Sequence, residues 1–252
     1  MRSIIEDIQS EFRRFIDSRK VNLLIISCEP QDSALLLKGL EALDDDPESL
    51  DIFLTFCHPF NDSGEYVREI PPSISQELAE VNEELVKRGE PVLPPPSEEM
   101  MNESQEPPIR LVGLMRYVES LVTDKRRVIW VIYPLEVGDR AAYSQLIGYV
   151  DNELKTESLR ITKLIVRDSA TAPMLVRGLE GQPNVKVYRP ELDPESFEKK
   201  LNEKANDPSI PAEEQAQLHM MLAGFDVAYQ RYDMALARNL EQIGRASCRE
   251  RV

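Results

Sequence analysis

The stretch LLIISCEPQDSALLLKGLEAL, residues 23–43, decides the fold class of this chain. It opens on a continuous apolar run, passes through a short polar loop and continues with leucines at helical spacing. A short apolar run between polar residues is typical of a parallel strand that is covered on both faces. The stretch therefore predicts a buried strand over 21–27 that leads into a helix over 32–43.

The same alternation continues along the chain. Further strands are expected over 51–57, 126–134, 161–168 and 184–190, and further helices over 75–88, 109–123, 139–156, 172–181 and 193–205. Strands that alternate with helices in this way predict an α/β fold, in which a parallel sheet lies between two helical layers. An amphipathic helix over 3–17 precedes the first strand, and its apolar stripe is expected to dock on another element. Trp130, inside a strand, is expected to be a core residue.

The net charge and the number of cysteines limit which partners and which cellular compartment are expected for this protein. Acidic residues outnumber basic ones 45 to 30, which gives a formal net charge of -15. Such a charge opposes sequence-independent attraction to nucleic acid or to anionic membranes, so neither is expected as a partner. No apolar stretch approaches the length of a membrane-spanning helix, and three cysteines are too few for a disulfide framework. We expect a soluble, cytoplasmic protein with reduced thiols.

The last ten residues, IGRASCRERV at 243–252, match the translation of a common sequencing adapter in one reading frame. We expect this segment to be an adapter artefact without biological information. The natural gene is then expected to continue past Gln242.

The loop after the first strand occupies the place where nucleotide-binding proteins hold phosphate. It aligns with the phosphate-loop pattern GxxxxGK[ST] through Cys28, Glu29, Pro30, Gln31, Asp32, Ser33, Ala34 and Leu35. That pattern needs glycines so that backbone N–H groups turn towards the phosphates, a lysine for the β and γ oxygens, and a hydroxyl for magnesium. Cys28 and Ser33 stand at the glycine positions, and Ala34 at the lysine position. Because Leu35 replaces the hydroxyl, every one of these contacts is lost.

The strand over 126–134 lacks the second half of a nucleotide-hydrolysing site. It ends in Tyr133 and Pro134, where a hydrolase places an aspartate for magnesium and an acidic neighbour for the attacking water. We therefore expect no catalytic residues, no cofactor and no bound metal.

The arrangement resembles the ATPase core of the signal-transduction ATPases with numerous domains, within the AAA-like P-loop class. The resemblance covers roughly residues 20–202 and is carried by LLIISCEPQDSALLLKGL, VIWVIYPLE, KLIVRDSA and VKVYRPELDPESFEKKL. It implies the strand order 5-1-4-3-2. Since the residues that would transfer activity are absent, the resemblance implies a pseudo-ATPase with a degenerate Walker A loop.

Two alternatives stay open. In the first, the domain binds or hydrolyses ATP or GTP through an unorthodox loop, with Glu136 or Asp139 serving magnesium. In the second, the domain is flavodoxin-like or receiver-like, with the order 2-1-3-4-5 and a small ligand. Strand order separates them, because the first and second strands are neighbours only in the second alternative.

The segment AQLHMMLAGFDVAYQRYDMALARNLEQ, residues 216–242, is similar to one tetratricopeptide unit. The resemblance implies that the unit packs and meets partners through Leu222, Ala223, Tyr229, Tyr232, Ala235 and Leu236. A single continuous amphipathic helix is the other interpretation. Repeats of this kind need about three or more copies to be stable, which suits a gene that continues past the adapter junction.

The sequence thus predicts an N-terminal helix (1–19), a degenerate P-loop-like α/β domain (20–205) with a proline-rich excursion (89–108), and an incomplete helical repeat (210–242). The expected function is a non-catalytic NTPase-fold scaffold that binds protein partners through its helical repeat.

Overall fold

The computed structural model describes residues 4–46, 49–97, 100, 102, 104–122, 126–156, 159–190 and 194–228. The chain forms two compact units, Met1–Pro190 and Glu191–Val252. Within the described residues, none of the helices combines the length and the apolar character that a membrane crossing requires.

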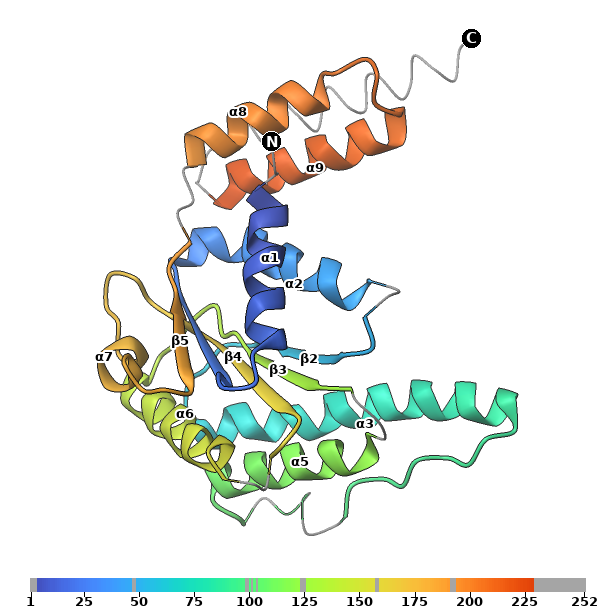
Figure 1. The fold of residues 1–252 in the computed structure, drawn as a ribbon, viewed down its shortest axis with the longest axis vertical. Helices are drawn as coiled ribbons and strands as arrows, with labels where there is room; N and C mark the ends of the chain where they lie inside the picture. The colour runs from blue at the N-terminus through green and yellow to red at the C-terminus, as the bar shows by residue number, and fades with distance from the viewer. Residues whose placement is uncertain are drawn as a thin grey trace. The chain divides into compact units, whose positions relative to one another are not determined.

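The first unit is built on a five-stranded parallel sheet (Figure 1). Its strands are β1 (Leu23–Ser27), β2 (Ile52–Phe56), β3 (Val128–Ile132), β4 (Thr162–Asp168) and β5 (Val185–Tyr188). The order is β2-β3-β4-β1-β5, which is the predicted order 5-1-4-3-2 read from the other edge. Because β1 pairs with β4 and β5, and not with β2, the flavodoxin-like order is wrong for this chain.

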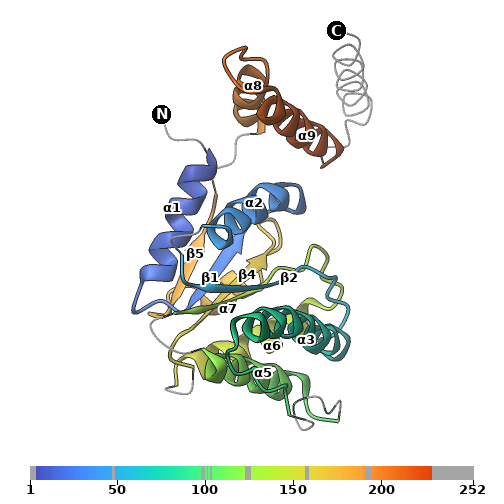
Figure 2. The same ribbon diagram turned by 90° about the vertical axis from the view of Figure 1, so that its right-hand side faces the viewer.

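Helices cover both faces of this sheet (Figure 2). One face carries α1 (Ile4–Asp17) and α2 (Ser33–Asp44), and the other carries α3 (Ser63–Arg88), α5 (Pro107–Leu121) and α6 (Arg140–Leu154). A short helix, α7 (Leu175–Leu179), precedes β5. The central strands β1, β3 and β4 are buried along their whole length, as the continuous apolar runs predict.

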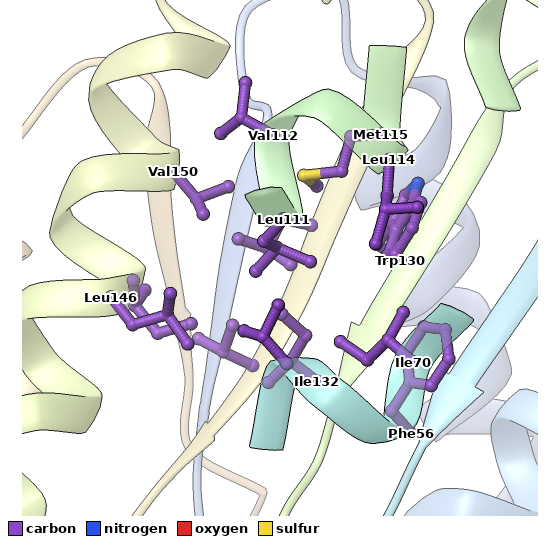
Figure 3. Close-up of a cluster of buried hydrophobic side chains, with 14 of the residues drawn as sticks. Phe56, Ile70, Leu111, Val112, Leu114, Met115, Trp130, Ile132, Leu146 and Val150 are labelled. Atoms are coloured by element: carbon purple, nitrogen blue, oxygen red, sulfur yellow. The ribbon is translucent and has the colours of Figure 1, made fainter. Parts of the chain in front are cut away.

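The larger core lies between the sheet and the layer of α3, α5 and α6 (Figure 3). Trp130 of β3 is fully buried there, as predicted, and stacks on Phe56 of β2 with ring centroids 5.5 Å apart. Leu114 and Met115 of α5 and Ile132 of β3 belong to the same cluster (Figure 3). This packing holds the carboxyl ends of β2, β3 and β4 in fixed positions.

On the opposite face, the apolar stripe of α1 docks on α2. Phe12 and Phe15 are completely buried, and Ile8 is 1% exposed. The two helices approach most closely at Gly39, where an added Cβ would lie 2.6 Å from Ile8 Cγ2. Only a residue without a side chain fits this crossing without a shift of its neighbours.

Lys163, at the start of β4, ties the end of α1 to the sheet. Its Nζ donates to the carbonyl oxygens of Ser18 and Val21 and lies 5.2 Å from the ring centre of Phe15. Burial, together with the nearby Arg127 guanidinium, lowers the pKa of Lys163 to about 8. The carboxylates that approach it, Asp17 and Asp51, offset only part of that shift.

The helix predicted over 75–88 begins much earlier, at Ser63. Asp62 caps it, because its Oδ1 accepts a hydrogen bond of 2.8 Å from the Glu65 N–H. Pro71 and Pro72 lie inside this helix, where proline removes a backbone donor and crowds the preceding turn. Burial of apolar side chains on both sides of these prolines outweighs that cost; the buried residues of this half are Tyr66, Val67, Ile70, Pro71 and Ile74.

The described part of the proline-rich segment is joined to α3 and α5 by hydrogen bonds. Gly89 ends α3 in the left-handed conformation, with φ of 71°. The Asn82 side chain pairs with the backbone of Leu93, donating at 3.1 Å and accepting at 2.7 Å. The Tyr117 hydroxyl donates to the Pro94 carbonyl oxygen. These bonds hold Leu93 and Pro94 against the two helices.

The second unit contains α8 (Pro194–Ala205) and α9 (Ala212–Ala228), which pack on each other. Their buried residues include Leu201, Ala205 and Leu222. The boundary between the two units follows Pro190, and α8 packs on α9 within the second unit.

Candidate functional site

The carboxyl ends of β1, β3 and β4 meet at one edge of the sheet, where ligands bind in folds of this type. A cavity of about 190 Å³ opens there. This volume lies below the roughly 300–1,000 Å³ of ordinary small-molecule pockets. The residues that define its chemistry are Glu29, Arg140, Tyr143, Arg167, Asp168 and Thr171.

The loop after β1 forms a helical turn instead of a phosphate cradle. Residues Pro30–Asp32 make the 3-10 turn η1, and α2 follows directly from Ser33. The Asp32 N–H donates to the Glu29 carbonyl oxygen at 3.0 Å, and the Ser33 N–H donates to that of Pro30. The Cys28 N–H donates to the Asp168 carbonyl oxygen at 3.1 Å. These three amides are therefore already engaged and do not turn inward on a ligand.

Cys28 and Tyr133 lie together beneath this loop. The Cys28 Sγ is 3.2 Å from the Tyr133 hydroxyl oxygen, and both residues are at most 2% exposed. Burial raises the pKa of the Cys28 thiol, although Tyr133 and the Arg167 guanidinium lower it in part. Burial likewise raises the pKa of Tyr133 far above its ordinary value. The pair is therefore a neutral contact with a structural role. Tyr133 follows β3 directly, at the position where a nucleotide hydrolase places an aspartate that binds magnesium.

Glu29 crosses from the first loop to the loop after β4. Its Oε1 accepts a hydrogen bond of 2.7 Å from the Thr171 N–H and lies 3.4 Å from the Ser169 hydroxyl oxygen. The Glu29 carboxylate thus accepts the Thr171 N–H at the edge of the cavity, so this donor is not free for a ligand. A bound phosphate there would meet negative charge at close range.

Asp168 is the last residue of β4, and its carboxylate accepts hydrogen bonds from backbone N–H groups of the next loop and of α7. Its oxygens accept from the N–H groups of Met174 at 3.0 Å and Val176 at 2.9 Å. It also accepts from its neighbour, the Ser169 N–H, at 3.0 Å. Carboxylates placed in this way stabilise a helix start through charge-assisted hydrogen bonds.

Arg167 lines the cavity and is hydrogen-bonded to the segment that follows β3. Only 6% of it is exposed, and its Nη1 donates to the carbonyl oxygens of Pro134 and Leu135, both at 2.9 Å. Its own carbonyl oxygen accepts from the Tyr143 hydroxyl at 3.1 Å. Arg167 and Asp168 were not predicted as site residues, although a charged pair at the end of an apolar strand was the available signal.

The proposed magnesium ligands lie elsewhere. Asp139 caps α6, since its Oδ1 accepts from the Ala142 N–H at 2.8 Å. Glu136 is exposed, and neither residue lines the cavity. Within the described residues, no group of three or more His, Cys, Asp or Glu side chains is placed to hold a metal ion.

The remaining predicted residues divide between surface and core. Pro30, Gln31 and Ala34 are exposed, whereas Leu35 is buried under the loop. In α9, Leu222 is fully buried and Ala223 is 6% exposed. The other residues assigned to the repeat lie outside the described part of the chain: Tyr229, Tyr232, Ala235 and Leu236.

No protein-family model matches the chain, and a comparison with curated proteins finds no significant match.

Proposed function

We propose that this protein is a non-catalytic scaffold, in which a pseudo-ATPase-like α/β unit carries a helical unit that binds protein partners. The observation that carries the proposal is the bond from the Thr171 N–H to Glu29. A site that binds triphosphate keeps its backbone donors for the ligand, and here the chain supplies the acceptor.

The balance of charge at the cavity supports the same function. Two carboxylates, Glu29 and Asp168, face two cations, Arg140 and Arg167. The side-chain donors of Arg167 are partly committed to two carbonyl oxygens. A triphosphate therefore meets no surplus of positive charge here, and the described residues that line the cavity include no lysine of the kind that reaches the β and γ oxygens.

The packing of α8 on α9 supports the helical part of the proposal. Leu222 and Ala223 are buried in α9, while Met220 is 58% exposed on the same helix. Paired helices that leave apolar side chains exposed are the building unit of repeat surfaces that bind other proteins. Partners of this unit are proposed to be proteins.

The competing function is nucleotide binding through an unorthodox loop. It requires Asp139 to leave the start of α6 or Glu136 to swing towards the cavity, and it requires Glu29 to give up the Thr171 amide. Each of these rearrangements breaks hydrogen bonds that the folded chain already makes.

Native mass spectrometry of the protein purified without denaturation tests the proposal. We expect only the mass of the polypeptide, because no site holds a nucleotide tightly enough to survive purification. A stoichiometric adenine or guanine nucleotide that is released by acid, and identified by its mass, would refute the scaffold function.

A further inference from the structure

The amino ends of the strands, opposite the cavity described above, carry a shallow basic hollow. It has a volume of about 720 Å³ and lies where the segment after α1 meets the end of α6 and the turn before β5. Among the described residues that line it, four are basic and none is Asp or Glu; the basic ones are Arg19, Lys20, Lys155 and Arg160. This local charge opposes the net charge of -15 of the whole chain.

Two of these cations are available to a ligand. Arg19 and Lys20 are exposed, and neither forms an ion pair with a described residue. Some other exposed cations are paired with a carboxylate, as Lys38 is with Glu41 and Lys87 with Glu84. Lys155 differs from Arg19 and Lys20, because it pairs with the buried carboxylate of Asp151.

The fold explains why basic side chains can gather at this hollow. The hollow is bordered by the C-terminal ends of α1 and α6. The exposed carbonyl groups of a helix C-terminus carry partial negative charge, which stabilises nearby cations. The free protein therefore tolerates a basic surface that remains open to an anionic ligand.

The floor of the hollow is held in place by hydrogen bonds. The N–H groups of Asn22 and Leu23 donate to the Asn184 carbonyl oxygen at 2.9 and 3.1 Å. The Asn22 side chain donates to the Leu154 carbonyl oxygen at 3.2 Å, and the Asn184 side chain donates to Asp151 at 2.7 Å. A surface fixed in this way loses little conformational entropy when it binds.

We propose that this hollow docks an acidic segment of a partner protein, through Arg19 and Lys20. Complementary charge is the attraction, and Pro183 adds an apolar rim. A protein segment fits better than a long polyanion, because nucleic acid or an anionic membrane extends over the rest of the acidic chain and is repelled. The surface lies on the α/β unit, so the inference adds a binding site beyond the helical unit.

Fluorescence anisotropy with a labelled oligoglutamate peptide at low ionic strength tests the proposal on the full chain. Arg19→Glu combined with Lys20→Glu should weaken binding roughly tenfold, since two attractions become two repulsions. Combined Arg19→Ala and Lys20→Ala substitutions should weaken it less, because they add no repulsion. The control, Lys38→Glu combined with Lys87→Glu, makes the same change in net charge at exposed sites elsewhere and should leave binding nearly unchanged.

Several results would overturn the proposal. These are no binding of oligoglutamate to the wild type, equal affinities for the wild type and the Arg19/Lys20 variant, or an equal loss in the control variant. Tighter binding of an oligothymidine of the same charge would instead assign the surface to nucleic acid. Thermal unfolding of each variant establishes that a loss of binding does not arise from a loss of fold.

Discussion

Replacing Gly39 with alanine should destabilise the protein, although alanine is the better helix former. Gly39 lies inside α2, at the point where α1 crosses it. The new Cβ would lie 2.6 Å from Ile8 Cγ2. Ile8 is buried and its branched side chain is restricted at χ1, so it has little freedom to move aside.

The size of the effect follows from two opposing contributions. Exchanging glycine for alanine inside a helix favours folding by about 1 kcal/mol. Inserting a methyl group into a packed contact costs about 1–3 kcal/mol. The free energy of unfolding should therefore fall, by up to about 2 kcal/mol. Gly148→Ala in α6 is the matched control, because nothing lies within 4 Å of its added Cβ, and this variant should be more stable by about 1 kcal/mol.

Urea denaturation followed by the fluorescence of Trp130, the single tryptophan, measures both variants. A double-mutant cycle with Ile8→Ala isolates the contact. In that background Gly39→Ala should become stabilising, with a coupling energy of about 1–3 kcal/mol. The reasoning is refuted if Gly39→Ala stabilises the wild type as much as Gly148→Ala does, because α1 then does not approach α2 at this residue.

Three further predictions concern the edge of the sheet and the end of α1. Asp168→Asn should lower the free energy of unfolding by about 1–3 kcal/mol in urea denaturation, because charge-assisted bonds to backbone N–H groups are lost; unchanged stability contradicts this. Glu29→Ala should speed hydrogen exchange of the Thr171 amide by roughly tenfold, whereas Glu29→Gln, which keeps an acceptor, should change it less. Equal rates in both variants contradict the role of Glu29. Lys163 has a folded pKa of about 8, below its ordinary 10.5, so unfolding takes up a proton between these values and stability rises with pH across this window. Urea denaturation over this range should show the wild type gaining stability relative to Lys163→Met, and a difference that does not change with pH refutes it.

Much of the fold follows from the sequence because its signals are local. Buried parallel strands appear as apolar runs, and β1, β3 and β4 lie within the predicted ranges. α3 begins earlier than predicted, because the burial of its first half, which outweighs the cost of its two prolines, depends on contacts with distant strands that no local pattern reports. The helix predicted over 193–205 is present as α8, and its packing on α9 is a tertiary contact that the sequence does not report.

The sequence states directly which phosphate-binding residues are missing, but it does not report which side chains take their place in the folded site. The absent glycines, lysine and aspartate could be read directly from the loop over 28–35 and from the strand end at Tyr133. The bond from the Thr171 N–H to Glu29 joins residues that are 142 positions apart. Arg167 likewise reaches the segment after β3, and no periodicity reports such contacts.

Titration calorimetry with ATP and GTP in the presence of magnesium tests the central claim most directly. A chain that closes its own phosphate position with Glu29 should give no saturable heat with either nucleotide at concentrations up to about 1 mM. A saturable heat with a dissociation constant in the micromolar range would contradict a scaffold without a nucleotide site.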